Sequence, residues 1–458
     1  MAALHHLVLP PRLLSGHGPP PVLRFSRRPR PLLHLLPRAA AAATRASAAA
    51  ATAVSAPSDA ALQNFRRWLS SQGADTGSVA PAVVPEGLGL VAARDLPRGE
   101  VVAEVPKKLW LDADAVAASD LGRVCGSAGD LRPWVSVSLL ILREAARGGD
   151  SLWAPYLAIL PRQTDSTIFW SEEELLEIQG TQLLSTTTGV KESRVFPELR
   201  GDKLALIPFA DLINHNGDIT SKESCWEIKG KGFLGRDTVF SLRTPMEVKS
   251  GEQIYVQYDL DKSNAELALD YGFTEENSSR DSYTLTLEIS ESDPFYEDKL
   301  DIAELNGMGE TAYFDVVLGE SLPSQMITYL RLLCLGGTDA FLLEALFRNK
   351  VWEHLELPVS RDNEESICQV IQNACKSALA AYHTTIEEDE ELLEREDLQS
   401  RQQIAIEVRV GEKKVLEQIN DIFKEREQEL DDLEYYQERR LKDLGFIGDN
   451  GDIIFWES

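Results

Sequence analysis

The sequence predicts an α+β protein whose last third is α-helical, and two observations predict this. From about residue 60 to residue 289, short runs of β-forming residues are punctuated by Gly and Pro, and two stretches with helical spacing of apolar residues interrupt them. After about residue 290, Leu, Ala, Glu, Arg and Gln dominate, again with apolar residues at helical spacing. We therefore expect short strands with inserted helices, followed by a helical domain.

The individual elements follow from these patterns in chain order. Runs of β-forming residues predict strands at residues 89–93, 101–105 and 253–258. Periodic apolar residues predict helices at residues 136–146, 171–182, 326–335, 340–347 and 367–382. The helix at 171–182 is further supported by three glutamates in its first turn, where carboxylates interact favourably with the helix dipole.

Charged residues dominate the segment after residue 386. We expect the acidic run at 387–391 to be a solvated helix face or loop, which is the usual state of such a run. The stretch that follows, up to Leu441, mixes charges with apolar residues and indicates a long amphipathic helix that packs within the molecule. A coiled-coil partner helix is the alternative, although the heptad spacing is irregular.

Residues 1–56 differ from the rest of the chain in charge. They contain seven arginines, no lysine and no acidic residue, and they are rich in Ala, Pro and Ser. This composition is typical of an organellar transit peptide, and a merely disordered tail is the alternative. We expect the leader to direct import and to be removed near residues 45–58.

The overall composition narrows the function. The 458 residues carry a net charge of −28, with 46 basic against 74 acidic residues, so we expect a basic or neutral partner rather than nucleic acid. After the leader, no window has the roughly 18 uninterrupted apolar residues that a membrane span needs. The five cysteines are scattered without a C-x-x-C pair, which argues against a zinc site and for buried thiols in a reducing compartment.

Residues that could take part in binding or catalysis gather in four short segments. The segments are Glu86-Gly87-Leu88-Gly89-Leu90, Ala210-Asp211-Leu212-Ile213-Asn214-His215, Tyr255-Val256-Gln257-Tyr258-Asp259 and Asp270-Tyr271-Gly272-Phe273. The polar residues of the second segment lie between apolar ones, so they must satisfy their hydrogen bonds in a local turn or through a ligand. No P-loop, H-E-x-x-H or G-x-S-x-G motif is present, and His354 and His383, in helical segments, are expected to be structural.

Taken together and in this order, the four segments resemble the SET-domain lysine methyltransferases. The chain is similar to the plant Rubisco large-subunit lysine methyltransferase family, whose helical C-terminal domain the residues after 290 also resemble. The resemblance implies a chloroplast transit peptide at residues 1–56 and a SET domain of short β-strands with a helical insertion at residues 57–289. An α-helical substrate-binding domain would follow at residues 290–458.

The resemblance also implies an activity: methylation of a lysine side chain with S-adenosylmethionine as the methyl donor. The implied substrate is the Rubisco large subunit or chloroplast fructose-bisphosphate aldolase in the stroma, and the sequence does not decide between the two. Methyl transfer is an in-line displacement, so the enzyme must hold a cationic sulfonium, present a neutral amine and exclude water. No metal, nucleic acid or membrane is implied, and we expect a monomer.

By resemblance, seven residues contact the cofactor. They are Glu86, Gly87, Leu88, Arg194, Asn214, His215 and Tyr271. Glu86 offers a carboxylate to the cationic end of the cofactor, and the neighbouring glycines let the backbone approach it closely. Asn214 and His215 hydrogen-bond its amino-acid and adenine edges.

The same resemblance implies a substrate side. Tyr258 matches the catalytic tyrosine, which aligns the amine with the methyl group; whether it takes a proton is open, because an unperturbed phenol is a poor base near neutral pH. Three residues earlier, Tyr255 is expected on the opposite strand face, packed in the core. Asp211, Arg194 and Trp226 resemble substrate contacts.

Phe273 resembles a position beside the amine pocket. A phenylalanine there holds neither the amine nor a water by a hydrogen bond, so we expect the product to progress to trimethyl-lysine. A plain core phenylalanine is the alternative.

One departure from the family leaves a second function open. In the family, a helical insert of a few tens of residues separates V-K-E from S-R-x-F, whereas here Glu192 is followed directly by Ser193. Because the insert forms part of the substrate-side wall, its absence allows a noncatalytic SET-derived module that docks a plastid protein. A nuclear histone methyltransferase is disfavoured by the leader and by the missing cysteine-rich segments.

Overall fold

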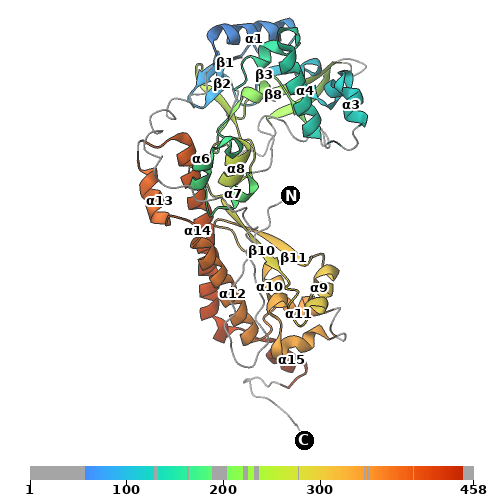
Figure 1. Ribbon diagram of the computed structural model, residues 1–458, viewed down its shortest axis with the longest axis vertical. Helices are drawn as coiled ribbons and strands as arrows, with labels where there is room; N and C mark the ends of the chain where they lie inside the picture. The colour runs from blue at the N-terminus through green and yellow to red at the C-terminus, as the bar shows by residue number, and fades with distance from the viewer. Residues whose placement is uncertain are drawn as a thin grey trace, which may run out of the picture. The chain divides into compact units, whose positions relative to one another are not determined.

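A computed structural model describes residues 57–446, except for residues 128–130, 132, 162–163, 188–203, 220–224, 232–236, 277, 345–346, 348–349 and 396. The described residues group into two units (Figure 1). The first unit contains residues 57–169 and 204–261, and the second contains residues 170–187 and 262–446. Each unit therefore combines two stretches that are separate in sequence. The leader and the junction at residue 193 lie outside the described residues.

Short strands form three small sheets in the first unit. The largest has the order β1-β2-β9-β6, in which β1 (Val79–Val84) and β2 (Gly87–Ala92) form an antiparallel hairpin. β9 (Gln253–Val256) pairs antiparallel with β2 and parallel with β6 (Asn214–His215). The other two sheets have the orders β3-β8-β7 and β4-β5; these strands are β3 (Val101–Pro106), β4 (Leu111–Asp112), β5 (Ala205–Leu206), β7 (Trp226–Lys231) and β8 (Asp237–Arg243). The expectation of many short strands is confirmed.

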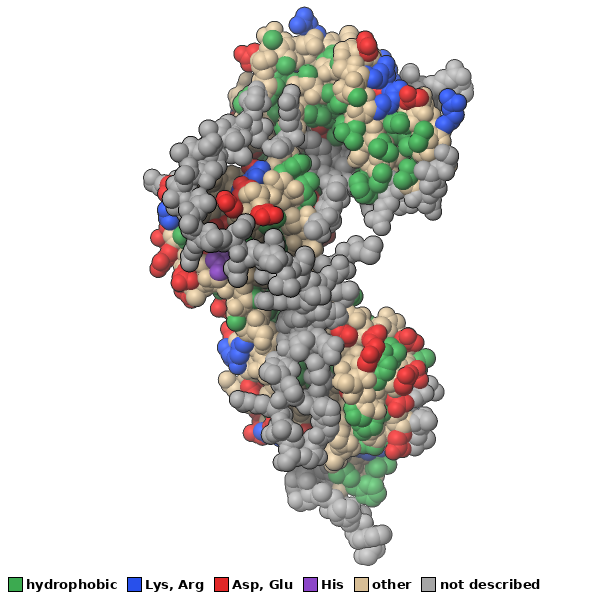
Figure 2. All heavy atoms as spheres, viewed as in Figure 1, with side chains coloured by type: hydrophobic (Ala, Val, Ile, Leu, Met, Phe, Trp, Pro, Cys, Tyr) green, Lys and Arg blue, Asp and Glu red, His purple; other side chains and the backbone are tan. Residues whose placement is uncertain are grey.

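Helices complete the first unit. They are α1 (Asp59–Ser71), α2 (Ala113–Ala118), α3 (Leu121–Ser127), α4 (Pro133–Arg147) and α5 (Ala154–Leu157). The side chain of Ser58 caps α1 by accepting a hydrogen bond from the Ala61 amide. α4 confirms the helix expected at 136–146, and it buries Val137 and Leu140 in the core of this unit. Leu142 on the same helix is 66% exposed, and Figure 2 shows apolar side chains gathered over α3 and α4.

The second unit is mainly helical. Its helices are α6 (Glu172–Glu177), α7 (Gln182–Thr186), α8 (Asn264–Asp270), α9 (Tyr296–Leu305), α10 (Met326–Cys334), α11 (Val351–Leu355), α12 (Arg361–Leu379), α13 (Ile386–Leu393), α14 (Ser400–Gln428) and α15 (Tyr436–Asp443). The long helices α12 and α14 pack together and share a core with the antiparallel pair of β10 (Ser282–Glu288) and β11 (Thr311–Val317). Acidic side chains gather over α9 (Figure 2), where Glu297, Asp301 and Glu304 are exposed. Among the described residues, no single helix is long and apolar enough to cross a membrane. The pair of α10 and the 3-10 helix η6 (Gly337–Leu343) has that length and composition only when the two are counted together, and a bend of 115° separates them.

Three helix predictions need correction. The helix expected at 171–182 is divided into α6 and α7 around Gly180, whose φ is +98°. A Cβ at this glycine would lie 2.9 Å from the Ala381 carbonyl oxygen, so the break lets the two backbones approach closely. Of the helix expected over 340–347, residues 340–343 form the end of η6, which starts at a glycine with φ +55°. The long helix expected up to Leu441 ends at Gln428, and α15 follows as a separate helix.

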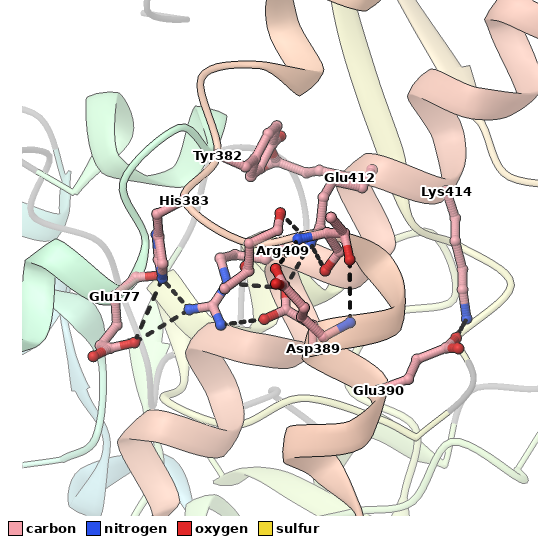
Figure 3. A network of polar contacts seen from close by, with 12 residues as sticks. Glu177, Tyr382, His383, Asp389, Glu390, Arg409, Glu412 and Lys414 are labelled. Carbon is pink, nitrogen blue, oxygen red and sulfur yellow. Dashed lines mark hydrogen bonds and ion pairs between the residues drawn. The ribbon is translucent and has the colours of Figure 1, made fainter.

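The acidic run at 387–391 forms most of α13, but one of its residues is not solvated. Asp389 is fully buried and accepts hydrogen bonds from Arg409 and Lys413 of α14, which are also buried (Figure 3). Burial alone would raise the pKa of Asp389, but the hydrogen bonds from Arg409 and Lys413 outweigh it and hold that pKa below its usual value. The prediction of a wholly solvated run is therefore wrong at Asp389, because its helix packs this position against two cations.

Candidate active site

The turn between β1 and β2 carries the first predicted site residues. Glu86 is exposed at this turn, and Gly87 starts β2 with a φ of +111°, a conformation that side chains rarely tolerate. Leu88 is half-buried and packs against the core of the first unit. Two residues beyond Gly87, a Cβ on Gly89 would lie 2.2 Å from Gln253 Oε1 and 2.8 Å from Asn214 Nδ2. The glycines therefore shape the backbone and leave room for side chains from β9 and β6.

A glutamine connects two of the predicted cofactor residues. Gln253 Oε1 accepts a hydrogen bond from Asn214 Nδ2 at 2.6 Å, and Gln253 Nε2 donates to Glu86 Oε2 at 3.0 Å. The hydroxyl of Tyr255 donates to Glu86 Oε1 at 3.1 Å and accepts from Gln253 Nε2 at 2.6 Å. Burial, and then the Glu86 carboxylate, raise the pKa of Tyr255, so this phenol stays a donor. Core packing was expected for Tyr255 and is wrong, because its hydroxyl has a polar partner at Glu86.

The polar segment 210–216 follows a strained turn. Phe209 has a φ of +81° and is the one non-glycine among the described residues with a positive φ; the 3-10 helix η5 (Ala210–Leu212) and β6 follow it. Because strained backbone needs surrounding structure to hold it, this turn fixes where the following residues lie. Asp211 of η5 is buried, and its Oδ2 accepts a hydrogen bond of 2.6 Å from the hydroxyl of the fully buried Tyr156.

His215 and Tyr258 contact each other directly. The backbone amide of Tyr258 donates to His215 Nδ1 at 3.1 Å, which assigns the proton of a neutral imidazole to Nε2. The Tyr258 hydroxyl donates to the Ile213 carbonyl oxygen at 2.8 Å, and the two rings lie 5.2 Å apart. Both ends of Tyr258 are therefore held by the segment that carries His215.

The remaining predicted residues lie elsewhere. Trp226 is half-buried on β7 and stacks on Phe240 with ring centroids 5.5 Å apart. Tyr271 and Phe273 belong to the second unit, where their rings lie 5.9 Å apart just after α8. Arg194 lies outside the described residues. The structure thus brings Glu86, Asn214, His215 and Tyr258 onto one sheet and its adjoining loop within the first unit.

Three polar residues of this site escaped the sequence interpretation. Gln253, Tyr255 and Tyr156 each hydrogen-bond a predicted site residue. Gln253 and Tyr255 occupy alternate positions on one strand, and this spacing places their side chains on the same face. That signal was present in the sequence, whereas Tyr156 lies 55 residues from Asp211 in an apolar segment and carries no local signal.

Comparisons with known proteins identify relatives of both matched regions. Residues 87–259 match the family described as SET domain, and residues 290–416 match the family described as Rubisco LSMT substrate-binding. The chain is 57% identical over 437 residues to the chloroplastic [fructose-bisphosphate aldolase]-lysine N-methyltransferase of Arabidopsis thaliana, with 87% of this chain and 90% of that protein covered. It is 56% identical to the chloroplastic ribulose-1,5 bisphosphate carboxylase/oxygenase large subunit N-methyltransferase of Nicotiana tabacum, with 86% and 88% covered.

A solved structure gives the same result in three dimensions. The crystal structure of the SET domain of LSMT bound to lysine and AdoHcy matches with a TM-score of 0.79 and 52% sequence identity, covering 86% of this chain and 97% of that chain.

The alignment to the Arabidopsis thaliana protein has 437 positions, whereas 87% of 458 residues is about 398, so about 39 positions hold no residue of this chain. This difference has the size of the helical insert expected from the family.

Proposed function

The chain belongs to the family of plant SET-domain protein-lysine methyltransferases that includes the Rubisco large-subunit and aldolase enzymes, and we propose that it methylates a lysine of one of these two proteins in the chloroplast stroma. The observation that carries this proposal is the 57% identity to an aldolase-lysine methyltransferase over nearly the whole length of that protein. The match extends through both the SET and the substrate-binding regions, so it covers catalysis and docking.

The residues present fit the cofactor S-adenosylmethionine. Glu86 and Asn214 are held side by side through Gln253 and offer oxygen acceptors for a cationic amino-acid end. Within the described part of the chain, and apart from its two chain neighbours, no heavy atom lies within 4 Å of the position that a Cβ on Gly87 would take, which leaves room beside this turn. His215, with its proton on Nε2, supplies a donor for the adenine edge. The aromatic contact proposed for Tyr271 rests on the family resemblance alone. Bound S-adenosylmethionine would supply the methyl group that is transferred.

The chain's own side chains would orient the acceptor lysine. Tyr258 is fixed by its amide and its hydroxyl, so its ring is placed before substrate arrives. Asp211, held by Tyr156, supports the proposed lysine contact, together with Arg194 and Trp226. Phe273 would leave the amine without a hydrogen-bond partner and so permit trimethylation.

The proposal extends to organisation and location. We assign the transit peptide to residues 1–56, the SET domain to residues 57–289 and the substrate-binding domain to residues 290–458, and both matched regions fall within these bounds. Both relatives are described as chloroplastic, which supports the chloroplast, and the stroma is where their two named substrates would be met. A monomer without nucleic-acid or membrane partners completes the proposal.

Isotope labelling of a stromal extract tests the proposed function. Purified full-length protein and S-adenosylmethionine carrying a labelled methyl group are incubated with extract, and mass spectrometry locates the labelled lysine. Label on the Rubisco large subunit or on aldolase, absent with the Tyr258→Phe variant, is the expected result. Binding of the cofactor without any labelling would favour the noncatalytic docking module, which the shortened chain had left open.

A further inference from the structure

Gln253 occupies a central position among the proposed cofactor residues. Its amide contacts three side chains: Asn214, Glu86 and Tyr255, at distances between 2.6 and 3.0 Å. Asn214 donates to the amide oxygen of Gln253, whereas Glu86 and the Tyr255 hydroxyl both accept from its amide nitrogen. Tyr255 in turn donates to Glu86, so Gln253, Glu86 and Tyr255 form a closed ring of hydrogen bonds that Asn214 joins through Gln253.

The direction of these bonds fixes which atoms face a ligand. Because Asn214 donates its Nδ2 to Gln253, its Oδ1 is the atom turned away from Gln253. The Glu86 carboxylate is held by two donors, which limits the rotation of an otherwise exposed side chain. The result is a pair of oxygen acceptors with restricted orientation, as an ammonium group requires.

The strand that carries this glutamine is paired on both sides. Gln253 opens β9, where it pairs with Val91 of β2, and two residues further along the same strand Tyr255 pairs with Asn214 of β6. The space that its amide occupies depends on Gly89, because a Cβ there would lie 2.2 Å from Gln253 Oε1. The second glycine of the E-G-x-G-L loop thus has a role separate from that of Gly87: it admits the glutamine.

We propose that Gln253 is a positioning residue for the amino-acid end of the cofactor, acting through Glu86 and Asn214 without reacting itself. This inference rests on the proposed function, because it assumes that S-adenosyl compounds bind at Glu86 and Asn214. It assigns to Gln253 the selection of ligands that carry an α-ammonium group over those that lack it.

Two ligands separate this role from a purely structural one. S-adenosylhomocysteine and 5′-methylthioadenosine share the adenosine and the thioether, but only the first carries the amino-acid group. Calorimetric titration of the full chain gives the dissociation constant of each. In Gln253→Met, which keeps the length of the side chain but removes the amide, we expect binding of S-adenosylhomocysteine to weaken by about tenfold or more and binding of 5′-methylthioadenosine to change by less than about twofold.

A second variant tests the polarity of the amide. Gln253→Glu keeps the shape of the side chain and the acceptor for Asn214, but it replaces the donor to Glu86 by a like charge. It should therefore weaken the binding of S-adenosylhomocysteine at least as much as Gln253→Met does. The matched control is Gln418→Met in α14, which removes a glutamine amide that also makes three hydrogen bonds, all to backbone groups of the second unit. This control should lower the unfolding temperature without changing either dissociation constant.

The outcomes are distinguishable. If Gln253→Met weakens the binding of both ligands equally, or leaves the binding of S-adenosylhomocysteine unchanged, the positioning role is overturned while the proposed function stands. If the wild-type protein binds neither ligand, the proposed function itself fails. Loss confined to the ligand with the amino-acid group supports the role, and non-additive losses in Gln253→Met combined with Glu86→Gln would show that it acts through Glu86.

Discussion

Tyr258 and His215 lie in contact but have separable roles in the proposed reaction. In Tyr258→Phe the ring still packs beside His215, whereas the hydroxyl that donates to the Ile213 carbonyl is lost. We expect methyl transfer to fall by a factor of about 100 or more, in the range typical for a misaligned reacting group, with cofactor affinity nearly unchanged. His215→Ala should instead weaken cofactor binding.

Turnover assays and calorimetric titration of both variants check this division. Equal loss of cofactor affinity in the two variants would contradict it. Unchanged turnover in Tyr258→Phe would remove the hydroxyl from the reaction.

The degree of methylation is expected to depend on Phe273. This side chain is half-buried beside Tyr271. A hydroxyl introduced by Phe273→Tyr could bind the amine or a water, and displacing that partner costs roughly 1–2 kcal/mol for each added methyl group. Intact-mass analysis over a time course should show trimethyl product with wild type and accumulation of monomethyl product with Phe273→Tyr. Identical product series would show that residue 273 does not set the outcome.

At the scale of single residues, the sequence predicted most of the polar groups but not their partners. Asp211, Asn214 and His215 stood out because polar groups between apolar residues need hydrogen bonds. Gln253 and Tyr255 did not, because Gln253 is simply part of a predicted strand and Tyr255 is predicted to pack in the core, whereas both side chains reach Glu86 across the sheet. Which partner a polar side chain finds depends on the strand register, and short strands with turns between them do not fix that register in advance.

Among the helices, α13 and α14 are joined by buried charges. Asp389→Asn keeps the shape of this side chain but leaves the buried Arg409 and Lys413 without its negative charge. Removing one partner of a buried ion pair typically costs about 3–5 kcal/mol, so the free energy of unfolding should fall by about that amount. Urea denaturation followed by circular dichroism measures it.

The neighbouring Glu390 provides the control for this change. It pairs with Lys414 at 2.8 Å, and both side chains are about half exposed. An exposed pair contributes about 0–1 kcal/mol, so Glu390→Gln should change stability little. Similar losses in the two variants would mean that burial of Asp389 does not decide its contribution.

Glu412 of α14 makes the second unit sensitive to pH. It is buried and accepts hydrogen bonds from the backbone amide of Gln182 and from the Tyr382 hydroxyl (Figure 3). Burial raises its pKa to about 7. The folded protein therefore keeps a proton that the unfolded chain releases near its ordinary pKa of 4.5, and stability should fall as pH rises through this window. Asp281, whose pKa burial raises to about 6, acts in the same direction.

The Glu412→Gln variant isolates this effect because an amide does not titrate. Between about pH 5 and about pH 8, the unfolding temperature of wild type should fall more than that of Glu412→Gln. Over this range the free energy of unfolding of wild type should fall by at most about 3 kcal/mol more than that of the variant. Thermal melts at several pH values provide the measurement. Parallel curves for the two proteins would show that Glu412 does not hold the extra proton.

Helical periodicity predicted where helices lie better than where they end. The helices at 136–146, 326–335 and 367–382 correspond to α4, α10 and α12, since each has a continuous apolar face. The break at Gly180 depends on contact with the Ala381 backbone, about 200 residues away, which local spacing cannot reveal. The burial of Asp389 could not be predicted for the same reason, because its partners lie on another helix.

For the whole molecule, the leader is expected to determine location. Removing its seven arginines leaves 39 basic against 74 acidic residues, so the imported protein would be more acidic than the precursor. A fusion of residues 1–60 to a fluorescent protein should enter chloroplasts and be shortened near residues 45–58. Microscopy and N-terminal sequencing check this expectation, and a fusion that stays in the cytosol would rule out a targeting role.

The grouping of residues 170–187 with residues 262–446 has a practical consequence for anyone who dissects this enzyme. A recombinant fragment that starts at residue 290 would lack Gln182 and Glu177, and with them one hydrogen-bond partner each of Glu412 and Arg409 on α14. It would also lack β10, the strand that pairs with β11. A soluble docking fragment would therefore require both stretches, rejoined by an artificial linker or by circular permutation, rather than a single cut in the chain.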